Sequence, residues 1–226
     1  MKLQATGWLV VVSLTLLRTA SGQDFQNLDF ESANLSPTSG QFGGPVPFSD
    51  AFPGWTGYIG ATQVTQALQN NLTIGSPSID ILGPNWRLSF GLIEGQYTAV
   101  LQPADLGGGG SYSASISQSG LVPANARSLQ FKAQTYSSFS ISLGGQDLSL
   151  VPLGTGANYT LYGADISPFA GQVETLTITA LAAPSTADYF DSIVFSPSSV
   201  PEPSVFGLLA LGGFFFGLRR SNCTIT

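Results

Sequence analysis

The sequence predicts an all-β fold, a β-sandwich or jelly roll of about ten short strands. Three observations support this prediction. Apolar and polar residues alternate with a period of two in short segments, Gly, Pro and Asn separate these segments, and no window outside the two ends of the chain has a sustained helical stripe. Residues 111–118 show the alternation most clearly, because Tyr112, Ala114 and Ile116 are spaced by serines.

The predicted strands follow one another through the whole middle of the chain. Residues 24–31 begin with strand-like alternation, and residues 34–50 form a loop rich in Pro and Gly. Gly144-Gly145 predicts a hairpin, because two glycines tolerate the positive φ angles of a two-residue turn. Gly107 to Gly110 is interpreted as a loop between strands. The other predicted strands cover residues 56–59, 78–82, 96–101, 111–118, 128–133, 139–143, 146–151, 158–166, 173–180 and 189–195.

Charge is distributed very unevenly along the chain. Between Gln23 and Pro203 the sequence has three cations and all 13 acidic residues, a net charge of −10. Such a segment repels nucleic-acid phosphates and anionic membranes, so nucleic-acid binding is excluded and a neutral or cationic partner is favoured. The other four cations, Lys2, Arg18, Arg219 and Arg220, flank apolar segments at the ends.

Residue types limit the chemistry that the chain can perform. It contains no His, and its one Cys, Cys223, lies beyond the last apolar segment. The usual Ser-His-Asp and Cys-His mechanisms and the usual zinc sites are therefore excluded, and no disulfide can form within the chain. A glycosidase with two carboxylates would still be compatible with these residues, but no close pair of acids stands out. We predict no catalytic residue and no enzyme activity.

The first 22 residues are interpreted as a secretory signal peptide. Lys2 provides the positive start, residues 8–17 the apolar core, and Ala20-Ser21-Gly22 the small residues of a cleavage site. The alternative, an uncleaved anchor helix, is disfavoured because the apolar segment is too short to cross about 30 Å of hydrocarbon. The mature protein is predicted to start near Gln23 or Asp24.

The other end of the chain has the features of a membrane-targeting signal. After Val200-Pro201-Glu202-Pro203-Ser204, residues 205–218 contain no charge and are followed by Arg219 and Arg220. As a helix, these 14 residues would span about 21 Å, against about 30 Å for a bilayer. We predict a single transmembrane helix, short for a permanent anchor, with the arginine pair in the cytoplasm. A buried core helix and a GPI signal are the disfavoured alternatives.

This C-terminal pattern resembles a PEP-CTERM sorting signal. The resemblance is carried by Pro201, Glu202 and Pro203, the short apolar segment, and the arginine pair. It implies an exported bacterial protein of the cell surface or extracellular space, initially anchored in the membrane and recognised by an exosortase. It also implies an association with exopolysaccharide and biofilm. The predicted organisation is a signal peptide at 1–22, a β-sandwich at 23–198 and the sorting signal at 199–226.

The middle domain resembles, more loosely, the galactose-binding-like jelly rolls. Residues 27–31, 52–55, 95–102 and 189–195 carry the likeness, as opening, second, middle and closing strands. In related domains the first and last strands share a structural Ca²⁺. The resemblance implies that Glu31 and Asp191 hold such an ion, with Asp29 nearby, and oxygen ligands suit Ca²⁺. The alternative is that these acids cap strand ends or face solvent. No other cofactor is expected.

A carbohydrate site would need an exposed aromatic face on which a pyranose can stack. Trp86, in a loop, is the preferred platform, because loops carry binding residues more often than strands do. Trp55 is a second candidate, although core packing is favoured for it. Tyr58, Tyr97 and Tyr136 are the other available rings.

Three functions remain open from the sequence. The first is a non-enzymatic structural or adhesive sandwich within the exopolysaccharide layer. The second is a lectin-like carbohydrate-binding module with a saturable site. The third, and least favoured, is a glycan hydrolase.

Overall fold

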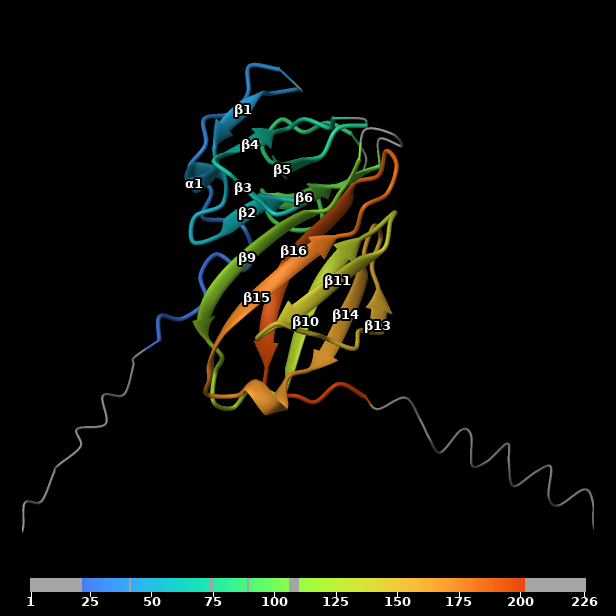
Figure 1. Ribbon diagram of the computed structural model, residues 1–226. Coiled ribbons are helices and arrows are strands. Elements are labelled where there is room, and N and C mark those ends of the chain that lie inside the picture. The colour runs from blue at the N-terminus through green and yellow to red at the C-terminus, as the bar shows by residue number, and fades with distance from the viewer. Residues whose placement is uncertain (1–21, 41, 74, 89, 106–109, 202–226) are drawn as a thin grey trace, which may run out of the picture.

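Two mostly antiparallel sheets pack face to face in the computed structural model, which describes residues 22–40, 42–73, 75–88, 90–105 and 110–201 (Figure 1). The eight-stranded sheet has the order β1 (Pro45–Pro47), β4 (Gln66–Gln69), β5 (Ser78–Leu82), β6 (Thr98–Gln102), β16 (Asp188–Ser196), β10 (Ser128–Gln134), β14 (Thr160–Asp165) and β13 (Val151–Thr155). The six-stranded sheet has the order β12 (Gln146–Asp147), β11 (Phe139–Leu143), β15 (Val173–Ala180), β9 (Ala114–Leu121), β2 (Thr56–Ile59) and β3 (Thr62–Val64). The predicted all-β sandwich is confirmed.

Only short elements lie outside these two sheets in the described part of the chain. β7 (Ala104–Asp105) and β8 (Ser111–Tyr112) form a small ribbon, and two single turns of helix, α1 (Phe48–Ala51) and η2 (Ser167–Phe169), connect strands.

The chain changes sheet at most of its long connections. After β9 in the six-stranded sheet it enters β10 in the eight-stranded sheet, returns to β11, and later passes through β14, β15 and β16 in the same alternating way. From β9 to β11 and from β14 to β16, consecutive strands therefore lie in opposite sheets instead of pairing side by side. This alternation is the jelly-roll connectivity that the sequence predicts.

The main core fills the space between the sheets with one face of each long strand. On β10, Leu129, Phe131 and Ala133 are buried, and the residues between them are partly exposed. On β15, Leu176 and Ile178 are buried in the same alternating pattern. Period-two alternation thus places the apolar side chains on the inner faces.

The predicted Gly-Gly hairpin is confirmed. Gly144 and Gly145 have φ angles of 60° and 77°, and β11 and β12 pair antiparallel on either side of them. The segment predicted as one strand, residues 146–151, ends after two residues of β12 and resumes as β13 in the opposite sheet.

The predicted opening strand at residues 24–31 is wrong. Asn27 and Phe30 have positive φ angles of 51° and 59°, so the chain turns there, and only Asp24 forms a β-bridge. Phe30 is fully buried against Phe52 and Trp55. The apolar spacing that resembles a strand therefore reflects a turn that inserts one aromatic ring into the core.

Candidate functional site

The loop between β5 and β6 is anchored by the Glu31 carboxylate. Glu31 Oε1 accepts the backbone N–H groups of Gln96 at 2.8 Å and Tyr97 at 2.9 Å. The chain can approach this closely because Gly95 has a φ angle of 62° and no side chain, and a Cβ there would lie 2.2 Å from Glu31 Oε1. Glu31 therefore holds the end of the loop just before β6 begins.

Asp191 anchors the same loop from β16. Its side chain is 1% exposed, and Oδ2 accepts the hydroxyl of Thr98 at 2.7 Å and the N–H of Glu94 at 3.2 Å. Oδ1 accepts the N–H of Ser192 at 2.7 Å. Burial raises the pKa of Asp191 to about 7, although these hydrogen bonds counteract part of the rise, and the Glu31 charge adds to it.

Of the three predicted calcium ligands, Glu31 and Asp191 both accept hydrogen bonds from the β5–β6 loop. Asp29 is exposed and accepts the N–H of Glu31 at 3.3 Å. Within the described ranges, no group of three or more Asp, Glu, His or Cys side chains is placed to hold a metal ion. Backbone N–H groups, which repel a cation, converge on Glu31 and Asp191. Calcium binding at these residues therefore remains a prediction.

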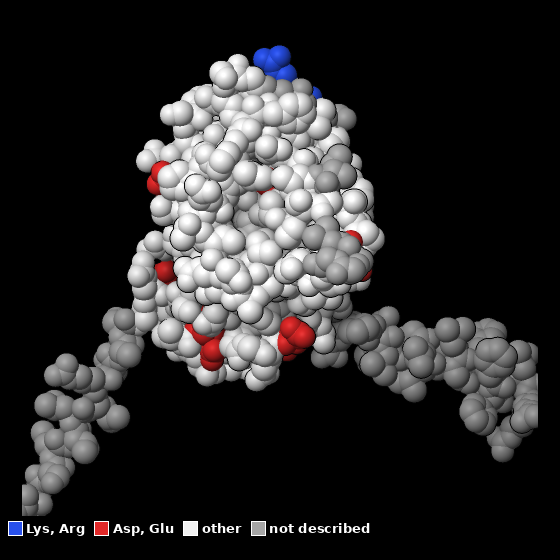
Figure 2. Space-filling model, turned by 45° about the horizontal axis from the view of Figure 1, so that its top comes forward, with Lys and Arg blue, Asp and Glu red and all other residues white. Residues whose placement is uncertain are grey.

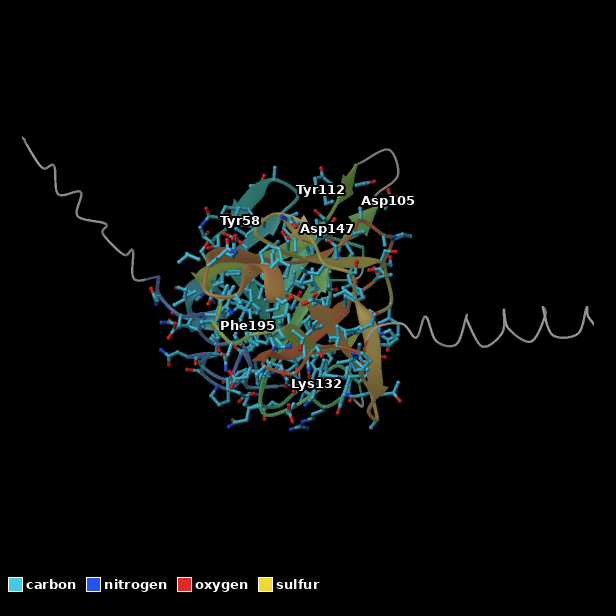
Figure 3. The ribbon with its side chains drawn as sticks, turned by 90° about the horizontal axis from the view of Figure 1, so that it is seen from below. Tyr58, Asp105, Tyr112, Lys132, Asp147 and Phe195 are labelled. Atoms are coloured by element: carbon cyan, nitrogen blue, oxygen red, sulfur yellow. The ribbon has the colours of Figure 1, made fainter. Side chains whose placement is uncertain are left out.

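Glu94 links this loop to the middle of the eight-stranded sheet. It forms an ion pair with Lys132 and accepts a hydrogen bond from the hydroxyl of Ser192. Both hydrogen bonds lower the pKa of Glu94, and the one from Lys132 has the larger effect. The ammonium of Lys132 also lies 5.2 Å from the ring centroid of Tyr159, a cation–π distance. Lys132 projects from the side of the sandwich opposite Tyr58, which belongs to the six-stranded sheet (Figure 3).

A hollow of about 440 Å³ opens next to this ion pair, at the tips of two loops. We call it the tyrosine hollow. The loop after β10 and the β13–β14 turn provide its walls, which are Ala133, Gln134, Thr135, Tyr136, Thr155, Gly156, Ala157, Asn158, Tyr159, Thr160 and Tyr162. Three tyrosines, two side-chain amides and three threonines thus line it, without a charged residue.

Hydrogen bonds hold the walls of the tyrosine hollow in place. Tyr136 is 60% exposed, and the amide of Gln134 donates to its hydroxyl at 2.8 Å. The buried Asp188 accepts the backbone N–H groups of Tyr136 at 2.6 Å and Ser137 at 3.0 Å. On the opposite wall, the amide of Asn158 donates to the Leu92 carbonyl at 2.6 Å. The aromatic face of Tyr136 is therefore presented from a fixed loop.

The two tryptophans do not offer an exposed platform. Trp86 is 6% exposed, its indole N–H donates to the Phe90 carbonyl at 2.7 Å, and it packs in a small cluster beneath the β5–β6 loop. Trp55 is 5% exposed in the main core and donates to the Asn27 carbonyl at 3.1 Å. The prediction of Trp86 as an exposed face is wrong, because the loop folds back over the sheet and buries the ring.

Among the tyrosines considered from the sequence, only Tyr136 is both exposed and in a hollow. Tyr97 is buried, and Tyr58 lies on the far sheet. Tyr159 was not predicted, because it falls at the start of a segment that reads as strand. The turn signal of Gly154 and Gly156 just before it is the only sequence feature that points to a loop position.

One face of the molecule carries few charges. In the view with the top of the molecule tilted forward, uncharged side chains cover most of the visible face, and the acidic groups are scattered toward its margins (Figure 2). A neutral ligand would meet no strong repulsion on this face.

The C-terminal segment of the described chain reaches the predicted sorting motif. Pro201 is exposed at its end, whereas Glu202, Pro203, Arg219 and Arg220 lie outside the described residues, as do the signal peptide up to residue 21 and the helix predicted at 205–218. Across the ranges that the structure describes, no helix is both long and apolar enough to cross a bilayer.

Fold and C-terminal sequence together define a β-sandwich with a sorting signal attached to its last strand. The PEP-CTERM protein-sorting motif matches residues 199–221. This motif implies a secreted protein that an exosortase processes. This confirms the resemblance that Pro201, Glu202 and Pro203 carry.

One solved structure is similar to the chain at low identity. It is TmCBM61 in complex with beta-1,4-galactotriose, with 16% identity, a TM-score of 0.41, and coverage of 76% of this chain and 96% of that one. A comparison with curated proteins finds no match. The sandwich architecture rests on the strand order described above.

Proposed function

We propose that the chain is a surface or extracellular-matrix protein whose non-enzymatic sandwich serves as a structural or adhesive element in exopolysaccharide. We also propose that it contacts saccharide through the tyrosine hollow. The observation that carries this proposal is the pairing of an export and sorting signal with a rigid, uncharged hollow that presents an exposed tyrosine ring.

The walls of the hollow suit a neutral sugar. The ring of Tyr136 offers an apolar face for the C–H side of a pyranose, while the amide oxygen of Asn158 and the threonine hydroxyls of the walls can meet its hydroxyls. The amide of Gln134 is engaged with the Tyr136 hydroxyl and the Gly91 N–H and holds the wall in place. Lys132 is already neutralised by Glu94, so a charged sugar gains little there. The loops are held by buried hydrogen bonds, which reduces the entropy lost when a ligand binds.

Replacing Tyr136 by alanine is expected to weaken saccharide binding by about five- to thirty-fold, because one stacked aromatic ring contributes on the order of 1–2 kcal/mol. Binding of the full chain to a panel of bacterial polysaccharides and a glycan array would be measured by calorimetry or array fluorescence. Tyr159→Ala is expected to act in the same direction. Tyr58→Ala, on the other sheet, is the matched control and should bind like the parent.

The outcome of that panel separates the candidate functions. Saturable binding that depends on Tyr136 supports an adhesive module. If no saccharide binds, the hollow has no sugar role and the sandwich is structural only. Release of reducing ends from any array sugar would contradict the non-enzymatic part of the proposal.

Calcium binding by Glu31 and Asp191, with Asp29 nearby, makes a separate prediction. If the ion bridges these carboxylates, adding Ca²⁺ raises the melting temperature, a chelator lowers it, and Glu31→Gln abolishes the difference. Asp165→Asn, an exposed acid on β14, is the control and keeps the response. A melting temperature that changes with neither Ca²⁺ nor chelator would contradict calcium binding and leave Glu31 and Asp191 as hydrogen-bond acceptors for the loop.

A further inference from the structure

The chain does not leave the sandwich where β16 ends. The Ser196 carbonyl accepts the N–H of Arg127 at 2.8 Å, and the buried hydroxyl of Ser128 donates to the Ser198 carbonyl at 2.7 Å. We call residues 197–201 the strap, because they run from the end of β16 onto neighbouring strands.

The end of the strap fits against a glycine of β14. Gly163 is buried, and a Cβ added there would lie 2.7 Å from Val200 Cγ1. Val200 and Pro201 also line a mainly apolar hollow of about 440 Å³ together with Leu148, Val151 and Phe169. A hydrogen bond at Ser198 and an apolar contact at Val200 therefore dock the strap at two points.

The strap overlaps the sorting motif. The motif match begins at residue 199, so Val200, which packs on Gly163, belongs both to the docked strap and to the sequence that the exosortase reads, while Ser199 and Pro201 beside it are exposed. No free spacer separates the folded sandwich from Pro201. Recognition of a peptide segment generally requires its backbone and side chains to be accessible in an extended form.

We propose that docking of the strap restrains processing, because the exosortase must wait for residues 199–201 to detach from the sandwich. The sandwich thereby sets how long the chain stays in its membrane-held form. Only the contacts at Ser128 and Gly163 are needed for this restraint, and the body of the sandwich can remain folded while the strap opens.

Processing of the full chain would be followed by pulse-chase in cells that contain the exosortase. Ser128→Ala removes the hydrogen bond to Ser198 without altering the matched motif, and Val200→Ser removes the methyl groups over Gly163. Each variant is expected to raise the processing rate about three- to ten-fold, in line with the loss of one hydrogen bond or of a small apolar contact. Ser119→Ala, on β9 in the other sheet, is the matched control.

Faster processing of both variants, with melting temperatures close to that of the parent, supports the proposal. Unchanged or slower processing of Ser128→Ala overturns it, and an effect confined to Val200→Ser would show direct reading of the motif instead. If Ser128→Ala lowers the melting temperature markedly, the buried control Ser115→Ala, which lies away from the strap, shows whether general destabilisation gives the same acceleration; if it does, the proposal fails. Saccharide binding is measured separately, so either proposal can fail without the other.

Discussion

The free energy of unfolding is expected to fall as the pH rises from 5 to 8, and Asp80→Asn is expected to remove a large part of that fall. Asp80 lies on β5 and is fully buried. Its Oδ2 accepts the hydroxyl of Ser78 at 2.7 Å and the amide of Gln102 at 2.6 Å, whereas its Oδ1 has no hydrogen-bond partner. Burial raises the pKa of Asp80 to about 7, and the two hydrogen bonds offset only part of this effect.

The sign of the effect follows from proton linkage. In the unfolded chain Asp80 loses its proton near its ordinary pKa of 3.8, whereas in the folded chain it keeps the proton until about pH 7. Between these values the folded state binds more protons, so its stability decreases as pH rises. The contribution of this bound proton to the free energy of unfolding is fully present below pH 3.8 and is lost once the pH passes about 7. Asp191, whose pKa is also raised to about 7, adds a second contribution of the same sign.

Denaturant unfolding at several pH values would measure this effect. At pH 8 the Asp80→Asn variant is expected to be more stable than the parent by on the order of 2–4 kcal/mol, since it has no charge to bury. Asp165→Asn is the control: the N–H of Ser167 lowers the pKa of Asp165, which is thus ionised throughout this pH range in both states. The free energy of unfolding of Asp165→Asn should therefore change between pH 5 and 8 by the same amount as that of the parent. A parent whose stability rises from pH 5 to pH 8 would contradict the prediction.

Phe131→Ala is expected to lower the free energy of unfolding by about 3–5 kcal/mol, the usual cost of removing a buried aromatic ring. Phe131 is 1% exposed at the centre of β10. Its ring lies 5.5 Å from that of Tyr162, 6.2 Å from that of Phe139 and 6.4 Å from that of Phe190, measured between centroids. These rings come from both sheets, so removal of the Phe131 ring would leave a cavity at the contact between the two sheets.

Urea unfolding with tryptophan fluorescence would measure this loss. Val194→Ala on β16, where the side chain is 51% exposed, is the control and should change stability by less than about 0.5 kcal/mol. The loss of stability in Phe131→Leu should lie between the losses in these two variants, because leucine retains part of the buried volume. A fall of less than about 1 kcal/mol in the free energy of unfolding of Phe131→Ala would contradict the prediction, because it would mean that the sheets move together and fill the cavity.

The sequence predicts those strands whose pattern is local. β2, β5, β11 and β15 have the predicted bounds, because each alternates or stays apolar between Gly, Pro or polar turn residues. Some strands of two to four residues, such as β3, β4 and β7, were missed, because a segment that short has too few residues to show a period. Their pairing depends on partners far away in the chain.

The candidate site was predicted only in part, because it also depends on contacts between distant parts of the chain. Glu31 and Asp191 do meet at one loop, as their place in the opening and closing segments suggests, but backbone N–H groups converge on them. Whether Trp86 is exposed depends on how residues 83–97 fold over the sheet, which no local pattern reveals. The tyrosine hollow joins the loop after β10 to the β13–β14 turn, a juxtaposition that only the strand order creates.

The register of β10 relates the strap to the tyrosine hollow. At one end of this strand Ser128 pairs with Ser196, next to the strap, and at the other Gln134 borders the tyrosine hollow, about 20 Å away at 3.3 Å per residue. Both ends of the described chain also leave the sandwich on its lower side (Figure 1). On the proposed route, a chain held by its C-terminal segment therefore has its tether and its tyrosine hollow at opposite ends of β10. A polymer could contact the hollow while the tether is in place, and loss of the tether would leave that contact intact.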